Sequence, residues 1–489
     1  MKINQFRHVE AKIDTRTGLL YQLFLCTALL LTGCAMVGPD YKGVQPDVPV
    51  VWHTQLQGGL QTGQIDPATL ANWWKTLNDP ILEDLEEQAV KGSLNLQTAK
   101  ARVREARAQR SSSKAGLFPS LNGSGSVNRY QTSKNNLGSG AENTVYDIGF
   151  DAGWEIDLFG GVRRSVEAAD ATLAASREDL NDVLVSLMAE VALNYVDVRT
   201  YQARLTAAKT SLVAQQKSYD LNLSSYKAGL INQLAVKQAE YNLERTQSLV
   251  PSLEIGLESA KNRLAVLLGK HPGTLHEQLA EYHQIPAIPI SMTIGIPAET
   301  LRHRPDIRRA EYNLAAQTAK IGVATADLYP KFRLMGTVGL ESISSSNLFQ
   351  SASRAWSIGP GISWNLFDGN AIRKNIEVQT ARQEQAMVAY ESAILHAQEE
   401  VENALTAYAK EQLRQDFLTR STVAAQLVID LADDQFNAGL VNYNVVLDAR
   451  RSFQSLEDEL AVSRGKVTSN MIRLYKALGG GWVPENDIQ

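Results

Sequence analysis

Cysteine is nearly absent from this chain, and so is any long apolar run beyond its first residues. Cys26 and Cys34 are the two cysteines, so the chain after Cys34 has no internal disulfide framework. Past Cys34, no run approaches the roughly 20 apolar residues that a membrane-spanning helix requires. The formal net charge is −5, and no basic cluster indicates nucleic acid as a partner. These absences exclude a disulfide-stapled scaffold, a helical membrane protein and a nucleic-acid-binding protein.

Catalytic and cofactor-binding signatures are missing as well. The sequence contains no Walker loop, no G-x-S-x-G nucleophile elbow and no H-E-x-x-H zinc motif. His271, His276 and His283 lie within one irregular stretch, but their spacing fits no metal-ligand motif. We therefore predict a protein that is not an enzyme and that holds neither a cofactor nor a metal ion.

Proline is absent from two long stretches, 161–226 and 369–436. Apolar residues recur at every seventh position within both. The recurring positions are Leu184, Val191, Val198, Leu205, Leu212, Tyr219 and Tyr226 in the first stretch, and Met387, Ile394, Val401 and Tyr408 in the second. A seven-residue apolar repeat keeps one seam of a helix against a partner helix and produces a left-handed coiled coil. Each helix would be about 100 Å long, because a helix rises 1.5 Å per residue.

A segment of alternating apolar and polar residues precedes each of these stretches. Its apolar positions are Tyr146, Ile148, Phe150, Ala152, Trp154, Ile156 and Leu158 in one case, and Trp356, Ile358, Pro360, Ile362, Trp364 and Leu366 in the other. About ten alternating residues with aromatic side chains on one face are typical of an outer-membrane barrel strand. A half-buried strand of a soluble sheet gives the same pattern, and this alternative stays open from the pattern alone.

Residues 1–33 have the pattern of a targeting segment. Basic residues precede a short apolar run, Leu19 to Leu31, which ends in Leu31-Thr32-Gly33-Cys34. These four residues resemble the lipobox of bacterial lipoproteins, and the resemblance implies that Cys34 is acylated. The alternative is an ordinary signal peptide followed by a chance cysteine. The next residue is Ala35 and not aspartate, which in such lipoproteins implies delivery to the outer membrane.

The chain also repeats its own order of elements at an offset of about 210 residues. Four pairs of short motifs stand at matching positions: Leu117-Phe118-Pro119 and Leu328-Tyr329-Pro330, Asp157 to Gly161 and Asn365 to Gly369, Tyr226 to Asn232 and Phe436 to Asn442, and Leu268-Gly269 and Leu478-Gly479. Such a repeat indicates an internal duplication, in which each half contains a helix, two strands, a long helix and a further helix.

The predicted organisation follows from this duplication. It comprises the targeting segment at 1–33, a lipidated tether at 34–79, a first repeat at 80–270, a linker at 271–297, a second repeat at 298–480 and a tail at 481–489. The repeats open with helices at 80–116 and 299–327. In the first repeat, strands at 120–131 and 145–158 precede helices at 161–226 and 232–268; in the second, strands at 331–341 and 355–366 precede helices at 369–436 and 443–478.

Four membrane-type strands are too few to close a barrel. An open sheet edge in lipid would leave backbone groups unsatisfied at several kcal/mol each, and small closed barrels need about eight strands or more. The barrel must therefore be shared between two, three or four copies of the chain, and this argument does not choose among them. Twelve or more strands could enclose an aqueous lumen, whereas eight barely hold side chains.

The whole of Cys34 to Trp482 resembles the TolC/OprM family of outer-membrane efflux channels, in its lipoprotein, NodT-like branch. The resemblance is carried by Cys34 with Gly38-Pro39-Asp40-Tyr41, Trp73-Trp74, Asp79-Pro80 with Leu82, the turns at Gly229 and Gly439, the stretch Val446 to Arg450, and Leu474 to Trp482. It implies a mainly α fold with a small β part: a trimer with a twelve-stranded barrel and a tunnel of twelve helices.

The same resemblance implies the partners and the location. The channel would lie in the outer membrane of a Gram-negative bacterium and extend into the periplasm. It would bind a periplasmic adaptor protein and, through it, an inner-membrane pump of the proton-driven RND type. It would conduct small molecules passively and use no cofactor.

Two groups of site residues follow from the resemblance. The helix-turn-helix tips, with Gly229, Leu230, Gly439 and Leu440, would dock the adaptor, and their glycines are expected at positive φ. The constriction would be formed by Asp448, Phe436, Val441 and Val445. Asp448 matches a family position that forms an acidic ring, in which crowded carboxylates favour cations.

Two departures from the family pattern and two rival functions accompany this assignment. A second acidic position of some family members falls at Val445, and the first-repeat equivalent of Asp448 is Gln238. The rival functions are a lipid-anchored coiled-coil scaffold without a pore and the exit duct of a type I secretion system. The exported substrate does not follow from the sequence.

Overall fold

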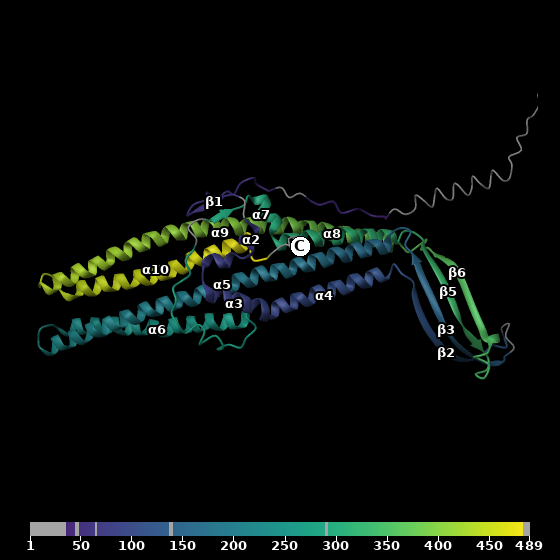
Figure 1. Cartoon of the computed structure of the whole chain (residues 1–489), viewed down its shortest axis with the longest axis horizontal. Coiled ribbons are helices and arrows are strands. Elements are labelled where there is room, and N and C mark those ends of the chain that lie inside the picture. The colour runs from purple at the N-terminus through teal and green to yellow at the C-terminus, as the bar shows by residue number, and fades with distance from the viewer. Residues whose placement is uncertain (1–35, 45–47, 64–65, 136–139, 289–291, 483–489) are drawn as a thin grey trace, which may run out of the picture. The chain divides into compact units, whose positions relative to one another are not determined.

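The computed structural model describes residues 36–44, 48–63, 66–135, 140–288 and 292–482 (Figure 1). This part of the chain falls into two compact units. The sheet unit consists of residues 36–43, 105–174 and 312–388, and the coil unit of residues 44–104, 175–311 and 389–482. The predicted fold class, mainly α with a small β part, is confirmed.

The sheet unit contains one antiparallel sheet in the order β2-β3-β5-β6 (Figure 1). Its strands are β2 (Ser120–Gln131), β3 (Glu142–Ile156), β5 (Lys331–Ser342) and β6 (Arg354–Ser363), with the 3-10 turn η2 (Ser351–Ser353) before β6. Each repeat supplies one hairpin, and β3 pairs with β5 where the two hairpins meet. The last strand ends at Ser363, so Trp364 and Leu366, which were predicted to lie in it, follow the strand.

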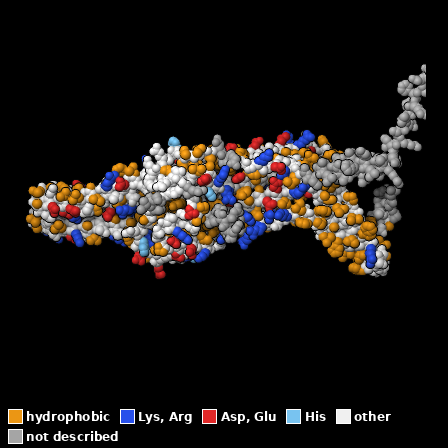
Figure 2. All heavy atoms as spheres, turned by 45° about the horizontal axis from the view of Figure 1, so that its top comes forward, with side chains coloured by type: hydrophobic (Ala, Val, Ile, Leu, Met, Phe, Trp, Pro, Cys, Tyr) orange, Lys and Arg blue, Asp and Glu red, His pale blue; other side chains and the backbone are white. Residues whose placement is uncertain are grey.

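The strand register places the predicted apolar positions on one face. Phe150 of β3 lies opposite Val338 of β5, which in turn lies opposite Trp356 of β6. These three side chains are exposed by 56, 58 and 75 per cent, and hydrophobic side chains gather over the sheet in Figure 2. An exposed apolar area of this kind marks a membrane or partner surface rather than the face of a soluble sheet.

The opposite face of the sheet is polar. Glu155 of β3 accepts hydrogen bonds from the Arg333 guanidinium of β5 at 3.2 and 3.3 Å. Asp151 accepts from the Ser124 hydroxyl at 3.3 Å, and the face continues with further serine, threonine and aspartate side chains. The period-two alternation of the sequence therefore separates an apolar from a polar face, as predicted.

Four long helices dominate the helical part of the chain: α5 (Gly161–Lys227), α6 (Gln233–Leu267), α9 (Ala371–Asn437) and α10 (Tyr443–Ala477). Within the coil unit, α6 folds back along α5 and α10 along α9 (Figure 1). Pro251 lies inside α6, and the helix continues past it. None of the helices in the described ranges is both long and apolar enough to cross a membrane.

The helix predicted to open each repeat is in fact two helices. The pairs are α3 (Pro80–Gly92) with α4 (Leu94–Ala115), and α7 (Pro297–His303) with α8 (Pro305–Ala326). The second break has a direct cause. Arg304 precedes Pro305, whose ring disfavours helical backbone at the preceding residue, and Arg304 accordingly has φ −73° and ψ 125°. The first break follows Gly92, a residue that weakens helices, at Ser93 with ψ 123°.

Segments predicted as tether and linker contain short elements of their own. These are β1 (Leu60–Thr62), α2 (Pro67–Ala71), the 3-10 helix η1 (Trp73–Leu77) and β4 (Met292–Ile294). β1 and β4 pair in parallel. The prediction missed this small sheet because three-residue strands leave no periodic pattern.

The main hydrophobic core lies in the coil unit. It includes Trp73 and Tyr475, which belong to the motifs that carry the family resemblance. Trp73 is fully buried and stacks on Tyr475 with ring centroids 5.4 Å apart. Asp79 caps the N-terminus of α3 by accepting from two backbone N–H groups, and its other oxygen accepts from the Tyr195 hydroxyl at 2.6 Å. Burial, with the bond to Asp79, raises the pKa of Tyr195.

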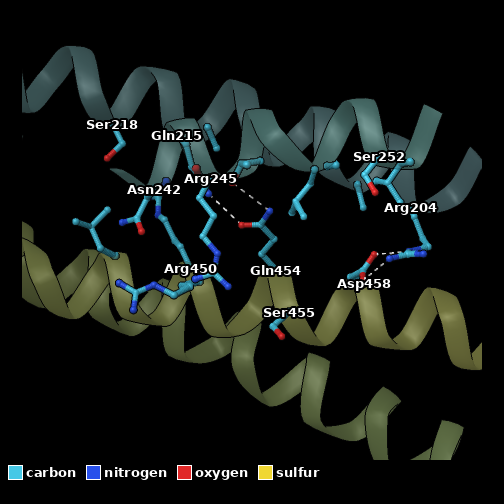
Figure 3. A pocket seen from close by; sticks show the side chains of 18 residues that line it. Arg204, Gln215, Ser218, Asn242, Arg245, Ser252, Arg450, Gln454, Ser455 and Asp458 are labelled. Carbon is cyan, nitrogen blue, oxygen red and sulfur yellow. Dashed lines mark hydrogen bonds and ion pairs between the residues drawn. The ribbon is translucent and has the colours of Figure 1, made fainter. Parts of the chain in front are cut away.

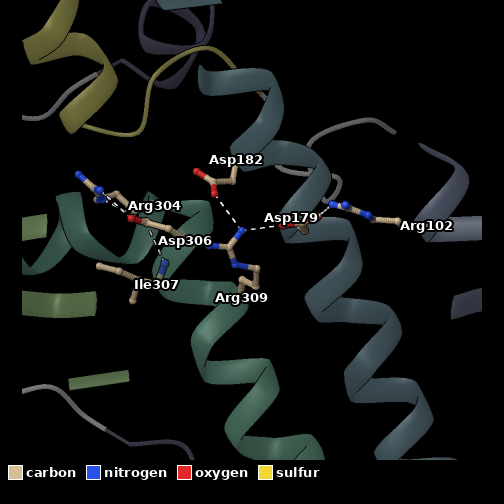
Figure 4. Close-up of polar contacts among 7 residues, drawn as sticks. All are labelled: Arg102, Asp179, Asp182, Arg304, Asp306, Ile307 and Arg309. Atoms are coloured by element: carbon tan, nitrogen blue, oxygen red, sulfur yellow. Dashed lines mark hydrogen bonds and ion pairs between the residues drawn. The ribbon is translucent and has the colours of Figure 1, made fainter. Parts of the chain in front are cut away.

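An arginine and aspartate network connects helices of the two repeats within the coil unit (Figure 4). Arg309 of α8 contacts Asp179 and Asp182 of α5 at 2.7 and 2.9 Å. Arg102 of α4 also reaches Asp179, at 3.4 Å. Because Arg309 bridges two carboxylates from the other repeat, it fixes α8 against α5.

The duplication is visible in paired hydrogen bonds of the sheet unit. The Trp154 indole donates to the Leu117 carbonyl at 3.0 Å, and the Trp364 indole donates to the Leu328 carbonyl at the same distance. Both carbonyls belong to the repeated Leu-aromatic-Pro motif that ends a helix before a strand. The two halves therefore share a hydrogen bond as well as an order of elements.

Candidate functional site

The two helix-turn-helix tips have the same backbone geometry. Gly229 has φ 75° and Gly439 has φ 70°, so the expected positive φ is confirmed at both. The Leu230 N–H donates to the Ser225 carbonyl at 3.0 Å, and the Gly229 N–H donates to the Tyr226 carbonyl at 2.9 Å. This pair of bonds is a Schellman motif, which satisfies carbonyls at a helix end.

The second tip repeats the motif, and both tips present an exposed leucine. The Leu440 N–H donates to the Gln435 carbonyl, and the Gly439 N–H donates to the Phe436 carbonyl, each at 2.9 Å. Leu230 and Leu440 are exposed by 77 and 75 per cent. Each tip therefore carries a large apolar side chain that is covered by nothing in the described part of one chain.

Gly439 is a position where a substitution tests backbone geometry alone. A Cβ added there meets no atom within 4 Å, so a side chain is opposed by the backbone conformation and not by crowding. We expect Gly439→Val to destabilise the tip by about 1–2 kcal/mol, because β-branched residues resist positive φ. Gly439→Asn should have a much smaller effect. Hydrogen exchange of the amides at 435–445 measures the difference, and equal protection in both variants would contradict the account.

The predicted constriction residues differ in how they are held. Phe436 is half-buried and packs against Tyr443 with ring centroids 5.1 Å apart. Both rings cover a small core between α9 and α10, formed by Ile429, Ala432, Val446 and Ala449. Val441 is half-buried and Val445 is 43 per cent exposed. Within one chain, Phe436 thus supports the helix pair, and a role at a constriction remains a proposal.

Asp448 points away from this small core. Its side chain is 69 per cent exposed and contacts Arg451 at 3.0 Å, one turn further along α10. An exposed ion pair between neighbours on one helix is weak, so the carboxylate stays hydrated and available. Each chain contributes a single Asp448, and an acidic ring therefore needs several copies.

Two polar links near the tips were not predicted. The Arg450 guanidinium donates to both oxygens of Asp433 at 2.9 and 3.2 Å, which joins α10 to α9. The Ser218 and Tyr443 hydroxyls share a hydrogen bond between α5 and α10. Asp433 therefore has a cationic partner within the chain. Arg450 belongs to a motif noted in the sequence, although its partner could not be identified there.

The predicted lipidation site, Cys34, lies outside the described residues. The segment that follows it is anchored within the sheet unit by Arg164 of α5, whose side chain is 1 per cent exposed. Its guanidinium donates to the Val37 carbonyl at 3.1 Å, the Gly38 carbonyl at 3.3 Å and the Asp40 carboxylate at 2.6 Å. The Gly-Pro-Asp motif is thereby fixed to the first turn of α5.

Gly38 shows why this motif requires glycine. Its φ is 86°, and an added Cβ would come within 2.4 Å of the Gly322 Cα. The sequence contains the motif but no sign that Arg164 is its partner, since 124 residues separate Asp40 from Arg164.

The histidines of the predicted linker contact different carboxylates. His276 lies 2.8 Å from Glu258, and His283 lies 3.8 Å from Glu281. Over the described ranges, no group of three or more His, Cys, Asp or Glu side chains is arranged to hold a metal ion.

Comparisons with known proteins agree with this geometry. The sequence profile of the family described as "Outer membrane efflux protein" matches residues 85–270 and again 296–480. Nodulation protein T of Rhizobium leguminosarum bv. trifolii is 30 per cent identical over 469 residues, which cover 94 per cent of this chain and 96 per cent of that protein. The cation efflux system protein CusC of Escherichia coli O6:H1 is 31 per cent identical, with coverage of 94 and 98 per cent. The solved outer-membrane channel OprN superposes with a TM-score of 0.86 at 36 per cent identity, covering 92 per cent of this chain and all of that one.

Proposed function

Because this chain belongs to the outer membrane efflux protein family, we propose that three copies of it form one conduit and that the conduit is completed by an adaptor and a pump. The chain is an outer-membrane efflux channel, and its family is one of channels and not a class of enzymes. The proposal concerns the assembly, the partners and the residues that gate it.

The single observation that carries the proposal is the four-stranded sheet with an exposed apolar face. Among the described strands, β2 and β6 each pair on one side only. In lipid, such open edges leave backbone donors and acceptors unsatisfied at several kcal/mol each, so they must pair with other copies. Three copies give twelve strands, which is enough for an aqueous lumen lined by the polar face that carries Asp151 and Glu155.

The tips support the proposal of a periplasmic adaptor as partner. Leu230 and Leu440 are exposed apolar side chains on rigid Schellman turns, and exposed apolar groups of this kind favour contact with another protein. An adaptor at these tips would connect the conduit to an inner-membrane pump of the RND type. The pump would select the small-molecule substrate, and the conduit would let it pass without chemistry or cofactor.

Acylation of Cys34 forms part of the same proposal. The Arg164 clamp begins three residues beyond Cys34, at Val37, so a lipid on that cysteine would be held near the first turn of α5. The lipid anchor would thereby be held beside α5, which is the helix that follows strand β3 and its apolar face. A protein scaffold without a pore would not need that apolar face, which favours the channel.

Asp448→Ala tests the proposed constriction. Three copies would bring three carboxylates round one axis, where they attract cations and obstruct passage. The substitution should raise single-channel conductance in planar bilayers and lower the preference for cations, since Arg451 would lose its anionic partner. Asp416→Ala is the matched control, because Asp416 is an equally exposed acid paired with Arg420 on α9.

A change in Asp448→Ala that is absent from Asp416→Ala would support the proposed constriction. If Asp448→Ala and Asp416→Ala both leave conductance and cation preference unchanged, Asp448 does not line a constriction. Susceptibility profiling of a strain that lacks this chain would distinguish small-molecule efflux from type I protein secretion, since only the former changes tolerance to small toxic compounds.

A further inference from the structure

A cavity of about 230 Å³ lies in the coil unit between α5, α6 and α10 (Figure 3). Gln215 reaches it from α5, Asn242 and Arg245 from α6, and Arg450 and Gln454 from α10. The cavity lies between three helices, and its lining combines polar and charged side chains with apolar ones such as Leu249, Leu253 and Leu447. Neither the family assignment nor the proposed constriction accounts for it.

The charges around the cavity leave one cation without a partner. Arg204 is neutralised by Asp458 through two contacts of 2.7 and 3.1 Å. Arg450 is paired with Asp433, and Arg451 with Asp448. Arg245 is solvent-exposed, and its guanidinium makes no hydrogen bond or ion pair within the described part of the chain. The lining therefore carries one positive charge in excess.

Buried polar atoms at the cavity also lack partners. Asn242, which lines the cavity, is 9 per cent exposed. The Nε of Arg450 and the Oε1 of Gln215 are buried without a partner. Buried polar groups in proteins are nearly always hydrogen-bonded, so these atoms indicate a bound polar species.

The unpaired atoms define the chemistry of that species. Arg245, the Arg450 Nε–H and the Asn242 amide are donors and carry the excess positive charge, which favours an oxyanion. The Gln215 oxygen is an acceptor and needs a hydrogen-bond donor, which a hydroxyl group can supply. Hydrogenphosphate offers both, because it combines acceptor oxygens with one O–H group, whereas a carboxylate or sulfate at neutral pH has no such donor.

We propose that this cavity binds a small phosphate-type oxyanion, either inorganic phosphate or a phosphate monoester whose organic part carries a hydroxyl group. The bound anion contacts α5, α6 and α10 at once and so ties the α5–α6 hairpin to α10. The site is independent of the proposed trimer and partners, because one chain supplies every residue named.

Isothermal titration calorimetry on the purified full-length protein in detergent tests the proposal. Inorganic phosphate and glycerol 3-phosphate are the probes, and ionic strength is held constant with chloride. We expect one saturable site per chain for inorganic phosphate, for glycerol 3-phosphate or for both, and the relative affinities show which source the site prefers. Acetate and sulfate should bind at least about tenfold more weakly, which corresponds to the one hydrogen bond to the Gln215 oxygen that they cannot donate.

Three variants make the test specific. Arg245→Gln should weaken phosphate binding by about tenfold or more, because it removes the unpaired charge. Arg263→Gln is the control: this arginine lies on the same helix, is paired with Glu190 and lies outside the cavity. Asn242→Asp should also weaken binding, since it places a second negative charge in the cavity. Absence of saturable binding, equal affinity in Arg245→Gln, or acetate as strong as phosphate would overturn the proposal.

Discussion

Replacing Arg304 with methionine should lower the free energy of unfolding by about 3–5 kcal/mol, because it breaks a buried ion pair and leaves one partner in place. Arg304 lies between α7 and α8 and is 6 per cent exposed. Its guanidinium donates to Asp306 at 3.1 and 2.7 Å (Figure 4). It also donates to Glu400 and to the Ala477 carbonyl, each at 2.7 Å. One side chain thus joins α8, α9 and the end of α10.

The same pair makes the stability depend on pH. Burial raises the pKa of Asp306, but its hydrogen bonds and charge attraction to Arg304 outweigh burial and hold that pKa below the ordinary value of 3.8. The folded state thus binds this proton less tightly than the unfolded state does. The pair therefore stabilises the fold fully at pH values above the pKa that Asp306 has in the unfolded chain. This stabilisation is lost as the pH falls through the lower pKa of Asp306 in the folded state.

Thermal unfolding followed between pH 3 and pH 7 measures both effects. The unfolding midpoint of the wild-type protein should decrease as the pH is lowered. Arg304→Met should already have a lower midpoint at pH 7, and its midpoint should decrease less between pH 7 and pH 3. Arg420→Met is the matched control, because Arg420 forms an exposed pair with Asp416 that contributes little. Equal midpoints for Arg304→Met and Arg420→Met at pH 7 would contradict the importance of the buried pair.

The second large effect concerns the two faces of the sheet. Phe150 lies in the middle of β3 on the apolar face, and the next residue, Asp151, lies on the polar face. Phe150→Arg should destabilise the membrane-inserted sheet by about 2–4 kcal/mol per chain, which is the effect of arginine on the lipid face of a barrel near the midplane. Little assembled protein should then be recovered from the outer membrane.

Asp151→Arg is the control for this substitution, since it introduces the same side chain one residue away. It should assemble normally, because its arginine would lie on the hydrated face beside Ser124. The measurement is the amount of assembled protein in purified outer membranes, compared at equal expression. Equal recovery of the two variants would mean that the apolar face does not meet lipid.

Much of this architecture follows from short-range patterns in the sequence. Alternation at Phe150 and Trp356 gave the faces of the sheet, because side chains on a strand alternate with period two. Gly229 and Gly439 predicted the positions of the two helix-turn-helix tips, because glycine adopts positive φ without strain. These features depend on neighbouring residues, so one sequence is enough to predict them.

Features that depend on distant partners could not be predicted in this way. Arg164 and Arg304 bind groups more than 90 residues away, and nothing in their local sequence identifies those groups. Glu86 of α3 is buried with neither carboxylate oxygen hydrogen-bonded to the described chain, and burial raises its pKa well above the usual value. Glu86 lies among other acidic residues of α3, and nothing in that local sequence indicates its burial.

The mass of the detergent-extracted protein, unheated and boiled, tests the central claim most directly. In the proposed assembly, the open edges of β2 and β6 pair with other copies of the chain, and twelve strands enclose a lumen. The account predicts a particle of three chains that dissociates to one chain on boiling. A monomer in mild detergent would mean that the sheet edges do not pair between copies, and the shared barrel would be wrong.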